Sequence, residues 1–133
     1  MGYHVIRADE HEFEERPSPT GREDQAPRLA SDVTTAAELK ESRARLWRYP
    51  PGTRGRRHAD EGQEEVFVVL HGTLTMLLGE PPERVELKPR SVVAVEPKTP
   101  LQLRHDGEEE VVVFIYGAPP VQAGAEFFDD PEP

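Results

Sequence analysis

Short apolar stretches separated by glycine and proline turns occupy the chain from Ala44 onward. In several of them apolar and polar residues alternate, as in a strand that turns one face toward a core. We expect strands at residues 44–49, 64–70, 73–78, 85–87, 91–95, 101–105 and 111–116. Many short strands punctuated by turns are typical of an antiparallel sandwich or barrel. The pattern therefore predicts an all-β fold.

The strand predicted at residues 64–70 carries a charged residue, Glu65, on an otherwise apolar face. In residues 64–70, Glu65 shares a face with Phe67 and Val69, while the opposite face holds only valine and leucine. Both faces are largely apolar, so we expect both to be covered. A carboxylate on such a face costs several kcal/mol unless it is paired, protonated or bound to a metal. Glu65 is therefore a candidate functional residue.

The first part of the chain has a different composition. Residues 8–33 are polar and carry three prolines, so they bury little surface and we expect an irregular arm. Residues 3–6 are apolar enough to form one edge strand. Thr35 and Glu38 have the spacing of a capping box, which predicts a short helix over residues 35–42.

The end of the chain is acidic and contains prolines. Phe127 and Phe128 are able to pin it to a barrel, but we expect a frayed terminus. The chain then divides into an N-terminal arm (1–43), a barrel (44–118) and an acidic tail (119–133).

Length and composition limit the function. With 133 residues the chain has room for one domain, and without cysteine it has no disulfide, thiolate ligand or thiol nucleophile. No apolar run approaches the ~20 residues of a membrane span, and the first residues contain no signal-peptide core, so we expect a cytoplasmic protein without a membrane partner. The net charge of −10 repels phosphate backbones, so no nucleic-acid partner is expected.

Three arginines, Arg54, Arg56 and Arg57, stand just before His58. One interpretation is a solvated loop facing the surrounding acids. The other is a rim that attracts anions, because the planar guanidinium suits carboxylate and phosphate groups.

His58, Asp60 and Glu65 form a candidate metal site. His58 and Asp60 are two residues apart, so on an extended segment their side chains point the same way. Glu65 begins the returning strand after a turn at Gly62 and can face them across a hairpin. One imidazole and two carboxylates suit Mn, Fe(II), Ni or Zn. The alternative is a metal-free ion pair between His58 and Glu65.

These residues resemble the first motif of the cupin superfamily, G-x5-H-x-H-x(3,4)-E-x6-G. Gly52, His58, Glu65 and Gly72 match the motif, and Asp60 replaces its second histidine. The five marked positions of the second cupin motif fall on Arg90, Glu96, Lys98, Leu101 and His105, so none of its signature residues is kept. The resemblance implies a jelly-roll barrel, or antiparallel double-stranded β-helix, and a homodimer in which residues 3–7 cross to the neighbour.

Cupins usually hold their metal with three histidines and one glutamate. The resemblance therefore carries His58 and Glu65 over directly and Asp60 as a substitution, but Leu101 stands where the last histidine is expected. His105 lies four residues further along the same predicted strand, where it would line the opposite end of the cavity.

Two main functions follow. In the first, the barrel binds a small, anionic molecule with metal absent or weakly held, and the ligand contacts are Arg57, Leu101, Leu103 and His105. The alternative is a metal-dependent oxygenase or isomerase that uses His58, Asp60 and Glu65. A metal-independent acid/base enzyme and a non-catalytic module also stay open, so the sequence does not decide whether the chain is an enzyme.

Overall fold

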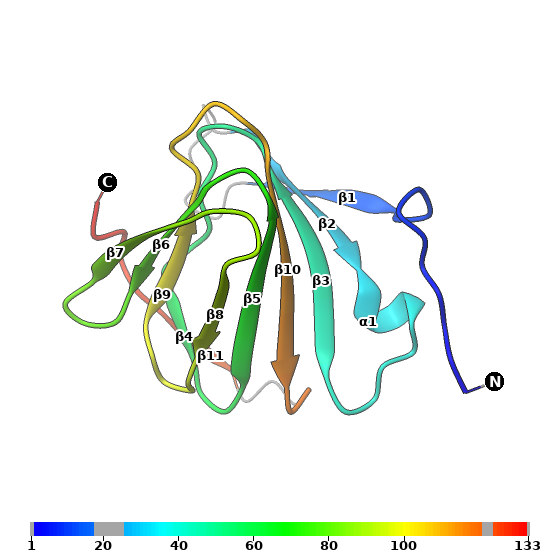
Figure 1. Cartoon of the computed structure of the whole chain (residues 1–133). Coiled ribbons are helices and arrows are strands. Elements are labelled where there is room, and N and C mark those ends of the chain that lie inside the picture. Colours follow the sequence, from blue (N-terminus) through cyan, green and yellow to red (C-terminus); the bar gives the residue numbers. More distant parts are fainter. Residues whose placement is uncertain (1, 18–25, 121–123, 133) are drawn as a thin grey trace.

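The computed structural model describes residues 2–17, 26–120 and 124–132, which fold into two facing antiparallel sheets (Figure 1). The six-stranded sheet has the order β1 (Phe13–Arg16), β2 (Arg28–Asp32), β3 (Arg43–Tyr49), β10 (Val111–Ala118), β5 (Glu64–His71) and β8 (Val92–Val95). The five-stranded sheet has the order β11 (Ala125–Phe127), β4 (His58–Asp60), β9 (Leu101–Arg104), β6 (Leu74–Leu78) and β7 (Glu83–Leu87). From β3 to β6 the chain changes sheet at every connection, which produces the predicted double-stranded β-helix.

The core lies between the two sheets. Its fully buried members are aliphatic and aromatic side chains from both layers, including Phe67, Val69, Met76, Leu101 and Val113. Burial of side chains of this size contributes about 1.5–3 kcal/mol each. This core fixes which face of each strand points inward, and so it fixes where Glu65 points.

The predicted alternation along β5 is confirmed on its inner face and wrong on its outer face. Phe67 and Val69 are each 1% exposed, and Glu65 shares their side of the sheet. On the outer face Leu70 is 53% exposed. No second layer covers this outer face among the described residues, so its apolar side chains have only their cross-strand neighbours to shield them.

The seven predicted strands are confirmed as β3 and β5–β10, with ends that differ by one or two residues. The irregular arm predicted over residues 8–33 needs correction, because β1 and β2 lie within it and extend the sheet beyond β3; residues 18–25 of this arm lie outside the described residues. The edge strand predicted at residues 3–6 is absent from the described structure, where this segment is irregular.

The predicted helix forms earlier than expected. Helix α1 (Val33–Ala36) has Asp32 as its N-cap, and the Asp32 carboxylate accepts hydrogen bonds from the Thr35 N–H at 3.2 Å and the Thr35 hydroxyl at 2.8 Å. Thr35 is therefore a donor inside the first turn rather than the cap. Glu38 has φ +52°, which ends the helix before residues 39–42 can join it. Helix α1 is far too short to cross a bilayer, and it is the sole helix of the described residues.

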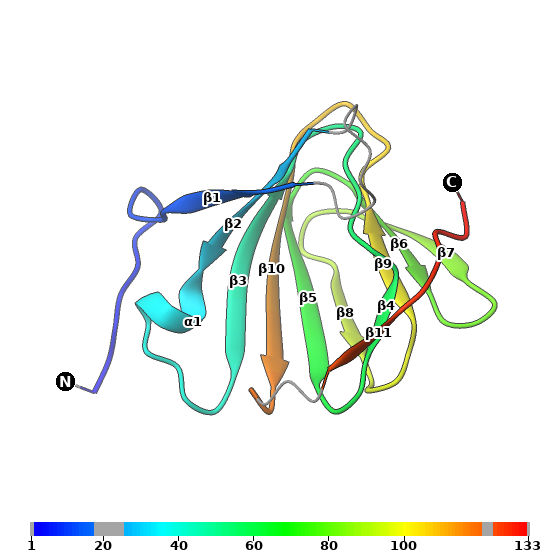
Figure 2. The ribbon, with the colours of Figure 1, turned by 180° about the vertical axis from the view of Figure 1, so that it is seen from behind.

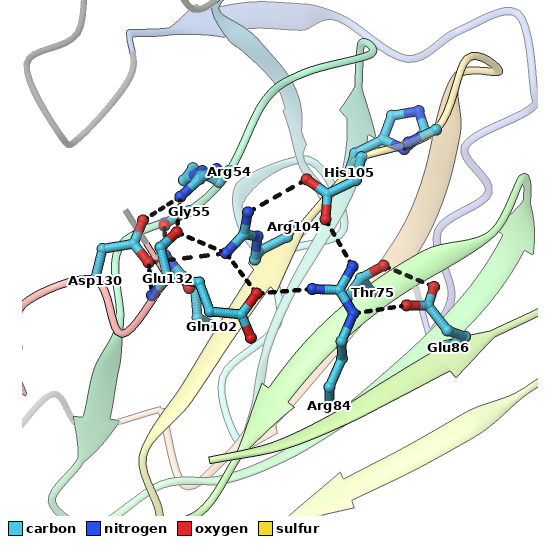
Figure 3. Close-up of polar contacts among 12 residues, drawn as sticks. Arg54, Gly55, Thr75, Arg84, Glu86, Gln102, Arg104, His105, Asp130 and Glu132 are labelled. Carbon is cyan, nitrogen blue, oxygen red and sulfur yellow. Dashed lines mark hydrogen bonds and ion pairs between the residues drawn. The ribbon is translucent and has the colours of Figure 1, made fainter.

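The tail is anchored rather than frayed over residues 124–132. Strand β11 pairs with β4 at the edge of the five-stranded sheet (Figure 2). Beyond β11, Asp130 forms an ion pair with Arg54, and the Glu132 carbonyl accepts from Arg54 and Arg104 (Figure 3). Arg84 reaches the same cluster, where it donates to Glu132 Oε1 at 2.8 Å. The acidic residues of the tail thus neutralise arginines of the barrel.

Candidate functional site

A cavity of about 420 Å³ opens between the sheets, and its lining includes the end of β4 and the start of β5. Its walls come from both sheets, including β11 at the edge of the five-stranded sheet. The lining residues are Arg28, Arg43, Ala44, Arg45, Trp47, Tyr49, Gly55, Arg56, His58, Asp60, Gln63, Glu65, Phe67, Leu103, Ile115, Gly117 and Phe127. A cavity of this size suits a small molecule, since ligand pockets measure roughly 300–1,000 Å³.

The structure brings His58, Asp60 and Glu65 together in the wall of this cavity. One ligand atom from each of the three lies within 4.8 Å of the others, and all three residues are partly buried. His58 and Asp60 come from β4 in the five-stranded sheet, whereas Glu65 comes from β5 in the six-stranded sheet. We expected these two strands to form a hairpin. Instead they belong to different sheets and meet at a corner between them.

A backbone contact sets the orientation of the His58 ring. Its Nδ1 lies 3.0 Å from the Arg56 carbonyl, so Nδ1–H donates there and Nε2 turns toward Asp60 Oδ2 at 3.6 Å. Burial disfavours the imidazolium, but the hydrogen bonds to Asp60 and Arg56 outweigh burial and raise the pKa of His58 above its ordinary value. The expected ion pair of His58 thus forms with Asp60 instead of Glu65.

The two carboxyl groups have opposite protonation preferences. The hydrogen bond with His58 lowers the pKa of Asp60 to about 2. Burial, reinforced by the hydrogen bond with Asp60 and its negative charge, raises the pKa of Glu65 to about 8. At neutral pH one carboxyl group is therefore ionised and the other holds a proton.

The donor set fits a divalent metal. Nε2 of His58 and one carboxylate oxygen each from Asp60 and Glu65 supply three ligands, and three protein ligands leave positions open for water or substrate. Leu101 lies opposite His58 in the ladder between β4 and β9 and is 1% exposed, so the position of a fourth ligand is filled by hydrocarbon. The triad is the sole group of this kind among the described residues.

Of the four residues expected to contact a ligand, Leu103 lines the cavity and the other three lie outside its lining. The buried Arg57 side chain donates to Glu80 at 2.6 Å and lies over the Phe128 ring, while Leu101 packs in the core. His105 is 1% exposed, with its Nε2 against the Glu109 carbonyl and its Nδ1 accepting from the Gly107 N–H. Arg57 and His105 thus have structural partners.

The sequence analysis missed most of the arginine and aromatic residues in the lining. Arg43 and Arg45 alternate along β3 with Ala44 and Leu46, on the same face as Trp47. This phase is readable in the sequence, and it places two arginines on the inner face. Arg28 and Phe127 carry no comparable local signal, because β2 and β11 bring them to the site through long-range pairing.

Solved structures similar to this chain share its fold. A sugar phosphate isomerase of the cupin superfamily from Silicibacter pomeroyi DSS-3 has a TM-score of 0.76 at 17% identity, covering 96% of this chain and 83% of that chain. The polyketide cyclase RemF from Streptomyces resistomycificus has a TM-score of 0.78 at 15% identity, with coverage of 97% and 87%. A predicted oxalate decarboxylase from Thermotoga maritima has a TM-score of 0.73 at 17% identity, with coverage of 86% and 98%. Identities this low establish the fold alone.

The sequence itself identifies the family. No curated protein is similar enough to the chain to count as a match. Residues 45–116, however, match the family described as Cupin domain, and this range covers most of β3, all of β4 to β9 and most of β10. The matched range includes the whole candidate triad, and the two sheets have the architecture that the motif resemblance implied. The chain therefore belongs to the cupin family.

Proposed function

We propose that this cupin holds a divalent metal at His58, Asp60 and Glu65 and binds a small-molecule substrate in the adjoining cavity. One observation carries the proposal: the three ligand atoms lie within 4.8 Å of one another in the wall of a cavity of about 420 Å³. The burial of Glu65 supports it, because a buried carboxyl group beside a second carboxylate is stabilised by a bound cation.

A metal at this site would act as a Lewis acid that polarises a substrate oxygen. The residues of the chain would hold and enclose the substrate. Phe67, Leu103 and Ile115 supply apolar contacts, and Phe127 closes the wall from the tail. Two structural neighbours are named sugar phosphate isomerase and predicted oxalate decarboxylase. The substrates in these names are rich in oxygen, which agrees with Lewis-acid chemistry.

Equilibrium dialysis against Mn, Fe(II), Ni and Zn tests the proposal. We expect about one equivalent of metal in the natural protein and a loss of binding in Glu65→Gln, which keeps the shape of the side chain but removes its charge. Glu64→Gln is the matched control, because Glu64 is exposed on the adjacent position of β5. Equal binding in both variants, or no binding by the natural protein, would overturn the metal site.

A second candidate function is metal-independent acid/base catalysis, favoured by the separation of the two carboxyl pKa values. A protonated Glu65 beside an ionised Asp60 is an arrangement that allows one group to donate a proton and its neighbour to stabilise charge. The same dialysis discriminates the two candidates, because metal-independent acid/base catalysis requires no metal at the triad, whereas the first candidate requires about one equivalent.

The homodimer implied by the cupin resemblance is also part of the proposal. Leu70, Val92 and Tyr116 project from the outer face of the six-stranded sheet and are 53%, 63% and 41% exposed. A second copy of the chain would cover these apolar side chains. Analytical ultracentrifugation would report a dimer, and Leu70→Glu would shift it toward the monomer; a monomeric natural protein would overturn this part. The cytoplasmic location stays a prediction.

A further inference from the structure

The inner face of β3 carries charge where the barrel interior requires apolar residues. Along this face Arg43 and Arg45 precede Trp47 and Tyr49, and all four line the cavity. Arginine is seldom found inside unless it is paired, because removal of its charge from water costs free energy. Burial carries this cost for Arg45 in particular, and a ligand that brings negative charge to this face would recover it.

Arg45 is a partly buried arginine on this face of β3. It forms no hydrogen bond or ion pair with the part of the chain that the structure describes. Its cross-strand neighbour on β2 is Asp32, whose negative charge attracts Arg45, but the Asp32 carboxylate accepts its hydrogen bonds from Thr35 at the start of α1. Burial and the neighbouring charge of Arg43 lower the pKa of Arg45. Both effects disfavour the charged guanidinium, and an anion bound beside it would offset them.

Arg28 on β2 presents a second guanidinium to the same cavity. It lies over the ring of Trp47 with its Cζ 4.9 Å from the ring centroid, and its Nη1 donates to the Tyr49 hydroxyl at 3.4 Å. Its Nε is buried and has no hydrogen-bond partner among the described residues. Stacking on an aromatic ring orients this guanidinium and leaves its edge available to accept an oxyanion.

The charge of the cavity is opposite to that of the protein. Four arginines line it, Arg28, Arg43, Arg45 and Arg56, against the two carboxyl groups of Asp60 and Glu65. The chain as a whole carries a net charge of −10. A local excess of positive charge in an acidic protein attracts anions to this cavity specifically and repels them elsewhere.

We propose that Arg45 and Arg28 form an oxyanion subsite that binds the carboxylate or phosphate group of a small organic anion with an apolar body. The apolar body would lie against Trp47, Phe67 and Ile115. Arg45 lies two strands across the sheet from Phe67 on β5, through Ile115 on β10, which is roughly 10 Å. Glu65 is two residues from Phe67 on the same face of β5, so a molecule bound at both arginines can extend toward the triad. Only this last point rests on the proposed metal function.

Trp47 provides a direct signal for the test, because it is the one tryptophan of the chain and it lines the cavity. We would titrate the metal-free full chain with benzoate, phenyl phosphate and uncharged benzyl alcohol and follow the tryptophan fluorescence. We expect saturable quenching by at least one of the two anions and much weaker quenching by the alcohol. The tighter anion then distinguishes a carboxylate subsite from a phosphate subsite. Equal affinity for the alcohol, or no quenching by either anion up to its solubility, would overturn the proposal.

Two variants locate the subsite. Arg45→Gln and Arg28→Gln should each weaken anion binding roughly tenfold, the size expected for a hydrogen bond to a charged group. Arg48→Gln is the matched control, since Arg48 lies on the same strand but faces outward and pairs with Glu110. Unchanged anion affinity in both subsite variants, or an equal loss in the control, would contradict the assignment.

The anion-site proposal and the metal-site proposal are tested by separate results. Anion binding by metal-free protein, or by Glu65→Gln, supports the subsite even if dialysis finds no metal. Conversely, Arg45→Gln should still bind one equivalent of metal. Loss of metal in that variant, together with unchanged thermal stability, would show that Arg45 serves the triad rather than an anion.

Discussion

His58 on β4 lies directly opposite Leu101 on β9. Cross-strand partners project to the same side of a sheet with their Cβ atoms about 4.5–5.5 Å apart, so Leu101 fills the space beside the imidazole where a fourth ligand would reach the metal. Because Leu101 is 1% exposed, its side chain also belongs to the core. At the position where the cupin resemblance implies a last histidine, the chain thus has a packed leucine that supplies no ligand atom.

Leu101→His should restore a fourth metal ligand. We expect tighter binding of Ni or Zn, by at least tenfold, together with a loss of about 2 kcal/mol in the free energy of unfolding of the metal-free protein, because a buried leucine is lost. Metal titration and denaturant unfolding measure the two effects. Leu101→Asn is the control for polarity at the same position, and an equal gain in affinity with asparagine would show that coordination by histidine is not the cause.

The raised pKa of Glu65 predicts an unusual pH dependence of stability. The folded protein keeps a proton on Glu65 up to about pH 8, whereas the unfolded chain releases it near the ordinary value of 4.5. Stability of the metal-free protein should therefore fall as the pH rises through this window, by an amount on the order of a few kcal/mol, and then level off. Denaturant unfolding at several pH values measures the slope.

Glu65→Gln should reduce the slope of stability between pH 5 and 8, because glutamine mimics the protonated side chain at every pH. The raised pKa of His58 should account for the slope that is left above about pH 6.5. Asp60 acts in the opposite direction: its pKa of about 2 means that its contribution is lost only as the pH falls below about 4. A natural protein whose stability rises from pH 5 to 8 would contradict the burial of Glu65 as a neutral group.

Gly117 on β10 makes room for the side chain of Gln63 beside the triad. A Cβ at position 117 would lie 2.6 Å from Gln63 Cδ, while Gln63 itself donates to the Pro119 carbonyl at 3.1 Å. Gly117 also stands between Glu65 and Arg43 in the strand register. Gly117→Ala should therefore destabilise the protein by about 1–3 kcal/mol, and the added change Gln63→Ala should restore most of the loss. Thermal unfolding of the single and double variants tests this, and failure of the second change to rescue would place the strain elsewhere.

The tail should detach when its principal ion pair is removed. Asp130 and Arg54 are 17% and 13% exposed, so Asp130→Ala leaves a largely buried arginine without its carboxylate. We expect a loss of about 1–3 kcal/mol and faster hydrogen exchange in β11, measured by mass spectrometry. Arg84→Ala is the control, because Arg84 is 42% exposed and its ion pairs are screened by solvent. Equal exchange in both variants would contradict the anchoring role of Asp130.

The barrel strands were predictable because their signals are local. Alternation and glycine or proline turns mark β3 and β5–β10 within single windows of sequence. Strands β4 and β11 have three residues each, too few for a periodic pattern, and they exist because they pair with each other and with β9. Strands β1 and β2 are polar enough to look irregular, but the edge of β3 offers hydrogen-bond partners to β2, and β2 in turn offers them to β1.

The candidate triad was predictable from spacing, since His58 and Asp60 share a face of an extended segment and Glu65 stands out on an apolar one. Arg43 and Arg45 were not predicted to line the cavity, although their phase relative to Trp47 on the same strand is visible in the sequence. The role of Arg28 depends on the register between β2 and β3, which no local pattern reports. Residue type and spacing thus indicate a metal site, while long-range pairing decides which side chains surround it.

X-ray absorption spectroscopy of the zinc-loaded protein tests the central claim most directly. If His58, Asp60 and Glu65 hold the metal, the spectrum will show one imidazole nitrogen and a shell of carboxylate or water oxygens, and His58→Gln will abolish the imidazole signal. Two or more imidazoles, or an imidazole signal that persists in His58→Gln, would contradict a metal centre at this corner of the barrel.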